Sequence, residues 1–459
     1  MIKLTDNEQI LFDHLKQVAL ENDIVVRAAG GWVRDKLLNR QSHDIDIAVE
    51  NASGYDFAVK FMAHLQQSGI ETHSIGQIMA NPEKSKNLQT ATTKALGFEL
   101  DFVGLRKEVY SESSRVPLIE TAGPAEDAMR RDFRCNALFF NIMLDKIEDF
   151  TGGLKDMSLT LIQTPLDAVK TFSDDPLRML RALRFSLQLN FQLSPEIIEA
   201  LKNFELVQRI QIVSRARFQQ EILKSFAIDP LMAVQMFMQF PDLYKIIFFG
   251  QLQVEIQEKW LQQTEMLVHN CKFQTLNSQE KQIVAFSLIS LPVLQDLKEI
   301  ELDLTKIEFF KGTKLKKMLE SPAYLVPLVC CAQSNKIALQ VKQLCDLWVF
   351  CDNSEFENEK GRKMIQFVKM VLGCEKDVAQ IIQKIDQFAG IKEQICEFYQ
   401  LKWGIFDVRF NVNLEELAAA VGLKDRKKYS WLKERVLEFA LQQPEYPIFS
   451  VDQFVLEGK

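Results

Sequence analysis

The sequence has little of what secreted, membrane-spanning or zinc-dependent proteins require. Its eight cysteines form no C-x-x-C pair, and its five histidines show no zinc-ligand spacing. No apolar run reaches the roughly 18 residues that a membrane span needs. The segment Met1–Lys16 carries three acidic residues, unlike a signal or transit peptide. We therefore expect a soluble protein with reduced, buried thiols that does not contact membranes and is not secreted. The cytoplasm is the predicted location, with the nucleus or an organelle as alternatives.

Strong positive charge is missing as well. The 459 residues carry a formal net charge of −7, which excludes a generally basic nucleic-acid binder. Any nucleic-acid surface must then be a local basic patch, and residues 306–317 and 424–435 are the two candidates. Each could equally be a solvated helix face. Apolar residues make up 47% of the chain and include 33 Phe, which favours packed helical cores over disorder.

The most informative segment begins with a glycine turn. Gly30 and Gly31 follow an expected strand at 24–28 and precede an expected helix at 32–38. Glycines at such a turn let backbone N–H groups approach a phosphate closely. Arg34, in the first helical turn, could reach a triphosphate.

An aspartate pair follows the glycine turn. Side chains alternate faces along a strand, so Asp44 and Asp46 point the same way while Ile45 and Ile47 point into a core. Two carboxylates on one face can share divalent cations that clamp the attacking and leaving oxygens of a phosphoryl transfer, and Mg²⁺ prefers such oxygen ligands. A lone D-x-D or Gly-Gly means little, because strand edges and turns often contain them. Together, the two motifs indicate nucleotidyl transfer.

A second charged cluster is formed by Arg130, Arg131 and Asp132. The arginines could bind phosphate or ribose, and Asp132 could hold one of them in place. A solvent-facing helix with charge pairs four residues apart would explain the same pattern. The motifs upstream favour the binding site.

The third cluster, residues 173–185, is typical of a helix start with an N-cap at Ser173 or Asp174. Asp175 and Arg178 would then be neighbours on one helix face. A carboxylate accepts from an exocyclic amine and a guanidinium donates to a ring nitrogen. C and A offer both groups, whereas G and U present a carbonyl and a ring N–H. A fixed Asp–Arg pair would accept C and A and reject G and U, unless the segment is an ordinary arginine-rich surface helix.

The pattern of apolar residues predicts a mixed α/β part followed by an all-helical part. In the first part, residues 98–103 form a strand, and Asp101 on it could supply a third carboxylate, unless Arg106 satisfies that side chain. Other predicted elements are helices at 8–21, 55–67 and 169–190, a hairpin with Gly97 alone at its tip, a polar loop at 106–124 and a strand at 136–142.

In this order, the clusters resemble the motifs of class II tRNA nucleotidyltransferases, the CCA-adding enzymes of the polymerase-β superfamily. Gly30–Asp35 is similar to the G-G-x-V-R-D turn, and residues 174–178 to the base-reading E-D-x-x-R motif. Asp149–Gly153 resembles a hinge-like D-x-x-x-G element, and residues 213–221 resemble the neck motif. Asp174 and Ala216 replace the usual Glu residues of the base-reading and neck motifs.

The resemblance implies a polymerase-β-like α+β head with catalytic function at 1–155. It also implies an all-α neck for base recognition at 156–230 and a helical body and tail for tRNA binding at 231–459. The reaction would be template-independent addition of CCA to the tRNA 3′ end from CTP and ATP, with Mg²⁺ as cofactor. Asp44 and Asp46 would hold the metal, and Asp101 would complete the catalytic set. The nucleotide-binding residues would be Gly30, Gly31, Arg34, Arg130, Arg131, Asp132, Asp175, Arg178, Arg181 and Arg184.

Several alternatives stay open at this point. The chain could add only CC or only the final A, and it could be a monomer or a homodimer. A poly(A) polymerase of the same superfamily would be expected to carry a strongly basic tail, which is missing here. A catalytically dead RNA-binding protein is disfavoured by the intact Asp44 and Asp46 pair.

Overall fold

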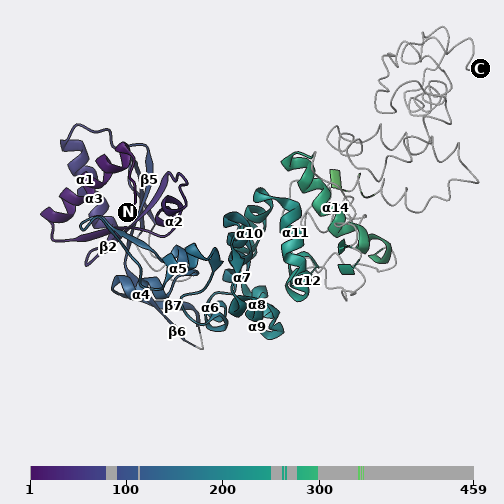
Figure 1. Ribbon diagram of the computed structural model, residues 1–459. Helices are drawn as coiled ribbons and strands as arrows, with labels where there is room; N and C mark the ends of the chain where they lie inside the picture. The colour runs from purple at the N-terminus through teal and green to yellow at the C-terminus, as the bar shows by residue number, and fades with distance from the viewer. Residues whose placement is uncertain are drawn as a thin grey trace, which may run out of the picture. The chain divides into compact units, whose positions relative to one another are not determined.

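The computed structural model describes residues 2–78, 90–111, 114–249 and 276–297, together with isolated positions between 261 and 345. The chain divides into two compact units, Met1–Glu221 and Ile222–Lys459, which are described separately (Figure 1). The basic segments predicted at 306–317 and 424–435 lie outside the described residues.

The first unit is built on a mixed sheet that contains seven strands in the described part of the chain. The strand order is β3-β4-β5-β2-β1-β8-β9. Strands β2 and β5 are parallel, and the other neighbours are antiparallel. The bounds are β1 (Val25–Ala29), β2 (Asp44–Glu50), β3 (Gly76–Ile78), β4 (Thr90–Ala95), β5 (Phe98–Gly104), β8 (Phe139–Asn141) and β9 (Lys146–Glu148).

Helices α1 (Asp6–Glu21) and α3 (Gly54–Gln67) pack on one face of this sheet (Figure 1). Helix α1 begins with a capping box in which Thr5 and Glu8 exchange hydrogen bonds. The main core lies between these helices and the strands, and it takes the alternate apolar side chains of β2. The opposite face of β2 carries Asp44 and Asp46, followed by Ala48, which is buried in a second, smaller apolar cluster.

Two hairpins differ from the sequence-based expectation. The β4–β5 turn contains Leu96 and Gly97, both at positive φ (54° and 86°), and not Gly97 alone. Two left-handed residues give the turn a twist that matches the flanking strands. The segment expected as a loop at 106–124 forms a hairpin of β6 (Arg106–Ser111) and β7 (Ser114–Thr121).

The helix expected at 169–190 is broken into α6 (Ala168–Asp174) and α7 (Leu177–Leu189). Pro176 lacks an N–H donor and forces the residue before it out of helical geometry. Asp175 accordingly has φ −138° and ψ 99°. The predicted N-cap at Ser173 or Asp174 is therefore wrong, since both residues lie inside α6.

The strand expected at 136–142 is also shorter. Residues Arg134–Asn136 form a 3-10 turn, and only Phe139–Asn141 pair in the sheet. The remaining elements of the first unit are α2 (Gly31–Leu37), α4 (Pro124–Met129), α5 (Gly153–Ser158), the strand pair β10 (Leu161–Ile162) and β11 (Gln192–Leu193), α8 (Pro195–Lys202), α9 (Phe204–Gln208), η3 (Arg209–Ile212) and the start of α10 (Arg215–Ile228).

The described part of the second unit is helical and rich in aromatic contacts. The rings of Phe226, Phe237, Phe248 and Phe286 form a connected buried cluster, as the high Phe content predicted. Its helices are α11 (Pro230–Met238), α12 (Pro241–Phe249) and α14 (Ser278–Leu297). Among the described residues, no helix combines the length and apolar character that crossing a membrane would require.

Cys135 gives a direct test of packing in the first unit. Its side chain is 1% exposed, and burial raises the pKa of the thiol to about 12. Because alkylating reagents attack the thiolate, we expect the Cys135 peptide to stay unmodified by iodoacetamide at about pH 8.5 in the folded protein. Peptide-resolved mass spectrometry should find it modified after denaturation. Equal labelling rates in the folded and unfolded chain would contradict this burial.

Candidate active site

Three carboxylates gather on the face of the sheet opposite α1 and α3. Along β2, Asp44 and Asp46 are exposed while Ile45 and Ile47 are buried, so the predicted alternation is confirmed. Asp101 is the register partner of Asp46 on the parallel strand β5. Register partners project to the same side of a sheet, so Asp101 lies beside the pair.

The carboxylate of Asp46 is crowded by its surroundings although one side stays open to solvent. This partial burial raises its pKa, the guanidinium of Arg131 lowers it, and Asp101 and Asp44 raise it again. The net result is a raised pKa, as expected where like charges face one another.

Asp44 and Asp46 fit a hard divalent cation, because both supply oxygen ligands and a bound cation would offset their mutual repulsion. No preformed group of three or more metal-ligating side chains occurs in the part of the chain that the structure describes. Mg²⁺ commonly takes its remaining ligands from water and substrate phosphates.

The glycine turn joins β1 to helix α2. Gly30 has φ 66° and ψ −120°, a conformation that is open to glycine almost alone. A Cβ at Gly30 would stand 2.8 Å from Nη1 of Arg131 and 3.8 Å from a carboxylate oxygen of Asp46. The Gly30 N–H donates to the carbonyl of Leu138, so a phosphate contact would have to come from later residues of the turn. Glycine at this position lets Arg131 approach the aspartate pair.

Arg34 does not extend into open space. It is 4% exposed, and it donates to both carboxylate oxygens of Asp35 and, at 2.6 Å, to the side-chain oxygen of Asn136. The amide of Asn136 in turn donates to Asp132. The predicted contact with a triphosphate would require Arg34 to leave these partners.

Arg130 and Arg131 are held by a residue that the sequence reasoning did not single out. Asp127 accepts from Arg130 at 2.6 Å and from Arg131 at 3.0 Å. The expectation that Asp132 holds one of these arginines is wrong. Asp127, in the last turn of α4, precedes the arginines by three and four residues and reaches both, whereas the carboxylate of Asp132 is taken up by Arg181.

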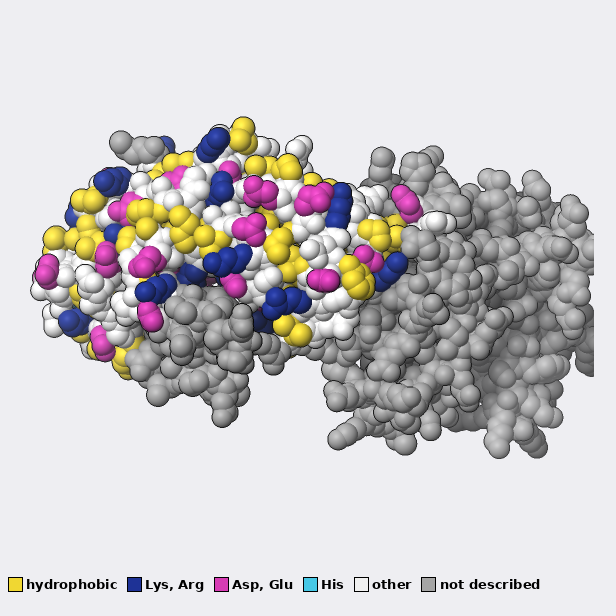
Figure 2. Space-filling model, turned by 90° about the horizontal axis from the view of Figure 1, so that it is seen from below, with side chains coloured by type: hydrophobic (Ala, Val, Ile, Leu, Met, Phe, Trp, Pro, Cys, Tyr) yellow, Lys and Arg dark blue, Asp and Glu magenta, His cyan; other side chains and the backbone are white. Residues whose placement is uncertain are grey.

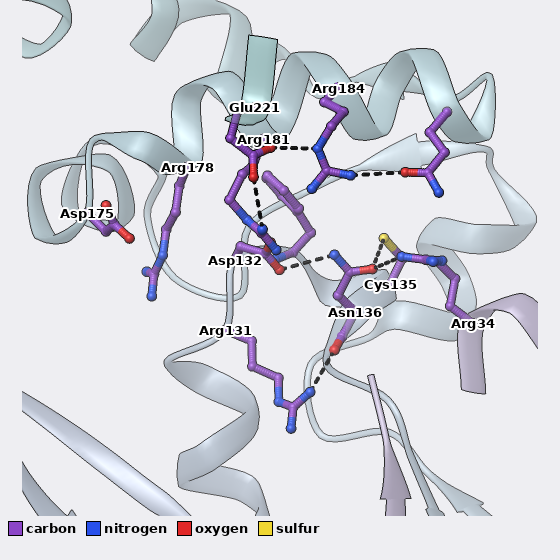
Figure 3. A network of polar contacts seen from close by, with 12 residues as sticks. Arg34, Arg131, Asp132, Cys135, Asn136, Asp175, Arg178, Arg181, Arg184 and Glu221 are labelled. Carbon is purple, nitrogen blue, oxygen red and sulfur yellow. Dashed lines mark hydrogen bonds and ion pairs between the residues drawn. The ribbon is translucent and has the colours of Figure 1, made fainter. Parts of the chain in front are cut away.

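Asp132 instead binds a residue of α7 (Figure 3). It accepts two hydrogen bonds from Arg181, at 2.6 and 2.8 Å. Burial raises its pKa, but Arg181 and Asn136 outweigh burial, so the pKa of Asp132 lies below its usual value. Glu221 of α10 faces Arg181 at 3.6 Å and binds Arg184 at 2.6 Å.

Arg184 is 7% exposed and is committed to Glu221, so within this network it positions α10 against α7. Together with Asn136, these pairs form a continuous chain of polar contacts from Glu221 to Arg34 (Figure 3).

Asp175 and Arg178 lie near one another but bind different partners. One oxygen of Asp175 accepts from the N–H of Leu177, and the other pairs with Arg217 at 2.9 Å. Arg178 donates to the carbonyl of Arg130 at 2.6 Å. Both side chains are predicted to read the base. Asp175 is thus oriented by α10, and Arg178 is oriented by the end of α4.

The D-x-x-x-G element is a tightly bonded turn. The carboxylate of Asp149 accepts from the backbone N–H groups of residues 151 to 154. A Cβ at Gly153 would meet the carbonyl oxygen of Arg134 at 2.3 Å, so only glycine fits there. The hinge role expected for this element stays a prediction.

Sequence reasoning missed two residues that organise the site, Asp127 and Asn136. The spacing of Asp127 from Arg130 and Arg131 could have revealed its role, because it is the ordinary spacing of helical ion pairs. No local signal pointed to Asn136, whose partner Arg34 is 102 residues away in the sequence.

Comparisons with known proteins agree with this geometry. Residues 26–163 match the poly(A) polymerase head domain family. The chain is 41% identical over 286 residues to the mitochondrial CCA tRNA nucleotidyltransferase of Saccharomyces cerevisiae, which covers 60% of this chain and 52% of that protein. It is 46% identical over 202 residues to the tRNA nucleotidyltransferase cca1 of Schizosaccharomyces pombe, covering 43% and 40%. The chain thus matches about half the length of these curated relatives or less.

The fold is similar to that of the Thermotoga maritima CCA-adding enzyme in its complex with tRNA, with a TM-score of 0.63, 18% identity and coverage of 99% of this chain and 96% of that one. At this identity the likeness concerns the fold alone. The predicted fold class, a mixed-sheet head followed by helices, is confirmed. The chain is thus similar to the poly(A) polymerase head domain family over residues 26–163, the segment that holds the glycine turn and the aspartate pair, and its sequence is similar to part of two tRNA nucleotidyltransferases.

Proposed function

We propose that this protein adds C, C and A to the 3′ end of tRNA from CTP and ATP, without a nucleic-acid template. The observation that carries the proposal is the placement of Asp44 and Asp46 on one face of β2, with Asp101 in register beside them and the Gly30 turn next to them. The strong sequence match to proteins named CCA tRNA nucleotidyltransferases supports this substrate class.

In the proposed reaction, the 3′-hydroxyl of the tRNA attacks the α-phosphorus of the nucleotide. A new O–P bond forms, the bond between the α-phosphorus and the bridging oxygen breaks, and pyrophosphate leaves. Asp44 and Asp46 would hold Mg²⁺, which when bound supplies charge stabilisation at the attacking and leaving oxygens. Asp101 would accept the proton of the attacking hydroxyl, and Arg131, beside Asp46, would meet the negative charge of the phosphates.

Base selection is proposed for Asp175 and Arg178. Both side chains are partly exposed, and each is oriented by a partner on a different element. Arg181 would support them through its ion pair with Asp132. Contacts of Arg34 or Arg184 with the nucleotide would be indirect, since both are buried in ion pairs.

The tRNA would be gripped by shape and phosphate contacts. Figure 2 shows basic and acidic side chains interspersed on the described part of one face, with no large patch of either sign there. For the main grip we propose the basic segments at 306–317 and 424–435, which the sequence indicates and which lie beyond the described residues. Two oligomeric states, monomer and homodimer, remain compatible with this proposal. The predicted location inside the cell also stays a prediction, and the Saccharomyces cerevisiae relative is named as mitochondrial.

One experiment tests the activity as a whole. We expect the purified chain, given tRNA that ends before CCA together with CTP and ATP, to produce tRNA extended by three nucleotides. Products should be resolved to single nucleotides, with each labelled nucleotide also supplied alone. CTP alone should give two additions, and UTP or GTP should give essentially none.

Three other outcomes would each point to a different function. A stall after two C additions, or extension only of tRNA that already ends in CC, would identify a partial adder. Long homopolymeric A tails on any RNA would identify a poly(A) polymerase. No incorporation with any nucleotide would favour an RNA-binding protein.

A further inference from the structure

Asp127 is a buried carboxylate at which the end of α4 meets the base of the β6–β7 hairpin. Its side chain is on α4 and the residue is 1% exposed. It accepts from Arg130 at 2.6 and 2.9 Å, from Arg131 at 3.0 Å and from the backbone N–H of Arg106 at 3.2 Å. Hydrogen bonds between charged groups in a dry setting are stronger than neutral ones and have defined geometry.

The contact with Arg106 involves the base of the β6–β7 hairpin. Arg106 is the first residue of β6 and pairs with Thr121, the last residue of β7. Besides the N–H bond to Asp127, the carbonyl of Arg106 accepts from Nε of Arg130 at 3.1 Å. Both backbone polar groups of Arg106 therefore bind the Asp127–Arg130 pair, which seats the hairpin on the end of α4.

The arginines lead from Asp127 into the candidate active site. Arg131 donates to the carbonyl of Asn136, lies over the ring of Phe139 and approaches Gly30. The carbonyl of Arg130 accepts from Arg178 at 2.6 Å. Asp127 thus orients Arg131, which lies beside the metal-site aspartates. It also holds Arg130, whose carbonyl binds the predicted base-reading residue Arg178.

The negative charge of Asp127 lets this residue hold both arginines. Burial raises the pKa of Asp127, but Arg131 and Arg130 outweigh burial and hold it below the usual value, so the carboxylate is ionised at neutral pH. From this carboxylate, Arg131 extends toward Asp46 and the glycine turn, where the proposed reaction would place the phosphates of the nucleotide.

We propose that Asp127 is a positioning residue for nucleotide binding, which orients Arg130 and Arg131 and makes their placement depend on the seating of the β6–β7 hairpin. This inference rests on the proposed function, because it assigns the arginines to a nucleoside triphosphate. A purely structural role would predict a loss of stability without a selective effect on nucleotide affinity.

The test compares Asp127→Asn with a matched control, Asp156→Asn. Asp156 is also a buried carboxylate of the first unit, at 4% exposure; its nearest cation is Arg134 at 3.9 Å, and the charges that act on it are those of Arg134, Asp149 and Lys155, none of which is assigned to the nucleotide. For Asp127→Asn we expect the KM for CTP to rise on the order of tenfold while kcat changes less than about threefold, because binding common to ground and transition states is lost. Asp156→Asn should change neither constant.

Hydrogen exchange of the full-length protein provides a second readout that is independent of activity. Amides of residues 106–121 should exchange faster in Asp127→Asn than in the wild type, and at the wild-type rate in Asp156→Asn. Unchanged exchange and an unchanged KM in Asp127→Asn would overturn the proposal. Equal changes in the two variants would overturn it as well, since they would reflect general loosening of the unit.

If Asp127→Asn does not fold, a further variant tests whether the β6–β7 hairpin is coupled to the nucleotide-binding arginines. Arg130→Gln leaves Asp127 bonded to Arg131 and to the N–H of Arg106, but it removes the bond to the Arg106 carbonyl. We expect faster exchange at residues 106–121 and a smaller rise in KM; wild-type values for both would overturn the coupling. If the wild type incorporates no nucleotide, the proposed function fails, while the exchange comparison still tests the seating of the hairpin on Asp127.

Discussion

Replacing Asp46 with Ala should reduce nucleotide incorporation by about a thousandfold or more without unfolding the protein. Asp46 shares its face with Asp44, and its register partner is Asp101. Loss of a metal ligand removes several kcal/mol of transition-state stabilisation, which corresponds to this factor in rate. Asp44→Ala should have an effect of the same order.

We expect Asp46→Ala to lose activity without losing stability. The raised pKa of Asp46 shows that its negative charge is disfavoured in the folded protein by burial and by the neighbouring carboxylates. Removing the charge should leave the melting temperature unchanged or slightly higher at pH 7. Asp13→Ala on α1, which is exposed on the other side of the sheet, serves as the control and should keep full activity. Wild-type turnover in Asp46→Ala would refute the metal-site assignment, and a collapsed fold would refute the stability argument.

The second large effect is expected in base choice when Asp175 is changed. Asp175→Asn keeps the size of the side chain and an oxygen for the Leu177 N–H, but it places a donor where the carboxylate accepted. We expect incorporation of U and G to rise relative to C and A, with the ratio of kcat/KM values for CTP and UTP falling by about a hundredfold or more. Single-nucleotide extension assays with each of the four triphosphates measure this ratio.

Arg217→Ala is the matched control for Asp175. It removes the same ion pair, at 2.9 Å between the two side chains, but leaves the carboxylate of Asp175 in place. The ion pair is largely solvent-exposed on the side of Arg217, so its loss should cost little stability. If Arg217→Ala relaxes base choice as strongly as Asp175→Asn, the effect comes from the packing of α10 beside Asp175 and not from a contact of Asp175 with the base.

The aspartate pair and the main helices of the head could be predicted because their signals are local. The period-two pattern of β2 is enough to place Asp44 and Asp46 on one face, whatever the strand packs against. The capping residues and apolar spacing of α1 similarly identify a helix from neighbouring positions. The break at Pro176 was also locally encoded, since proline cannot continue the helix from α6, yet the apolar pattern on both sides concealed it.

The partners of the charged residues were decided only by the tertiary structure. Asp132 and Arg181 are 49 residues apart, and Arg34 and Asn136 are 102 apart, so no spacing rule relates them. The choice depends on which chain segments the sheet and the neck helices bring together, and on burial, which makes an unpaired charge costly and so enforces pairing. The sequence by itself determined that this protein carries two same-face carboxylates, a glycine turn and two arginine-containing clusters, at 130–132 and 173–185. Only the fold determined that Asp101 stands beside Asp46, that Asp132 binds Arg181 of α7, and that Arg34 and Arg184 are enclosed in ion pairs, because these depend on strand register and long-range packing.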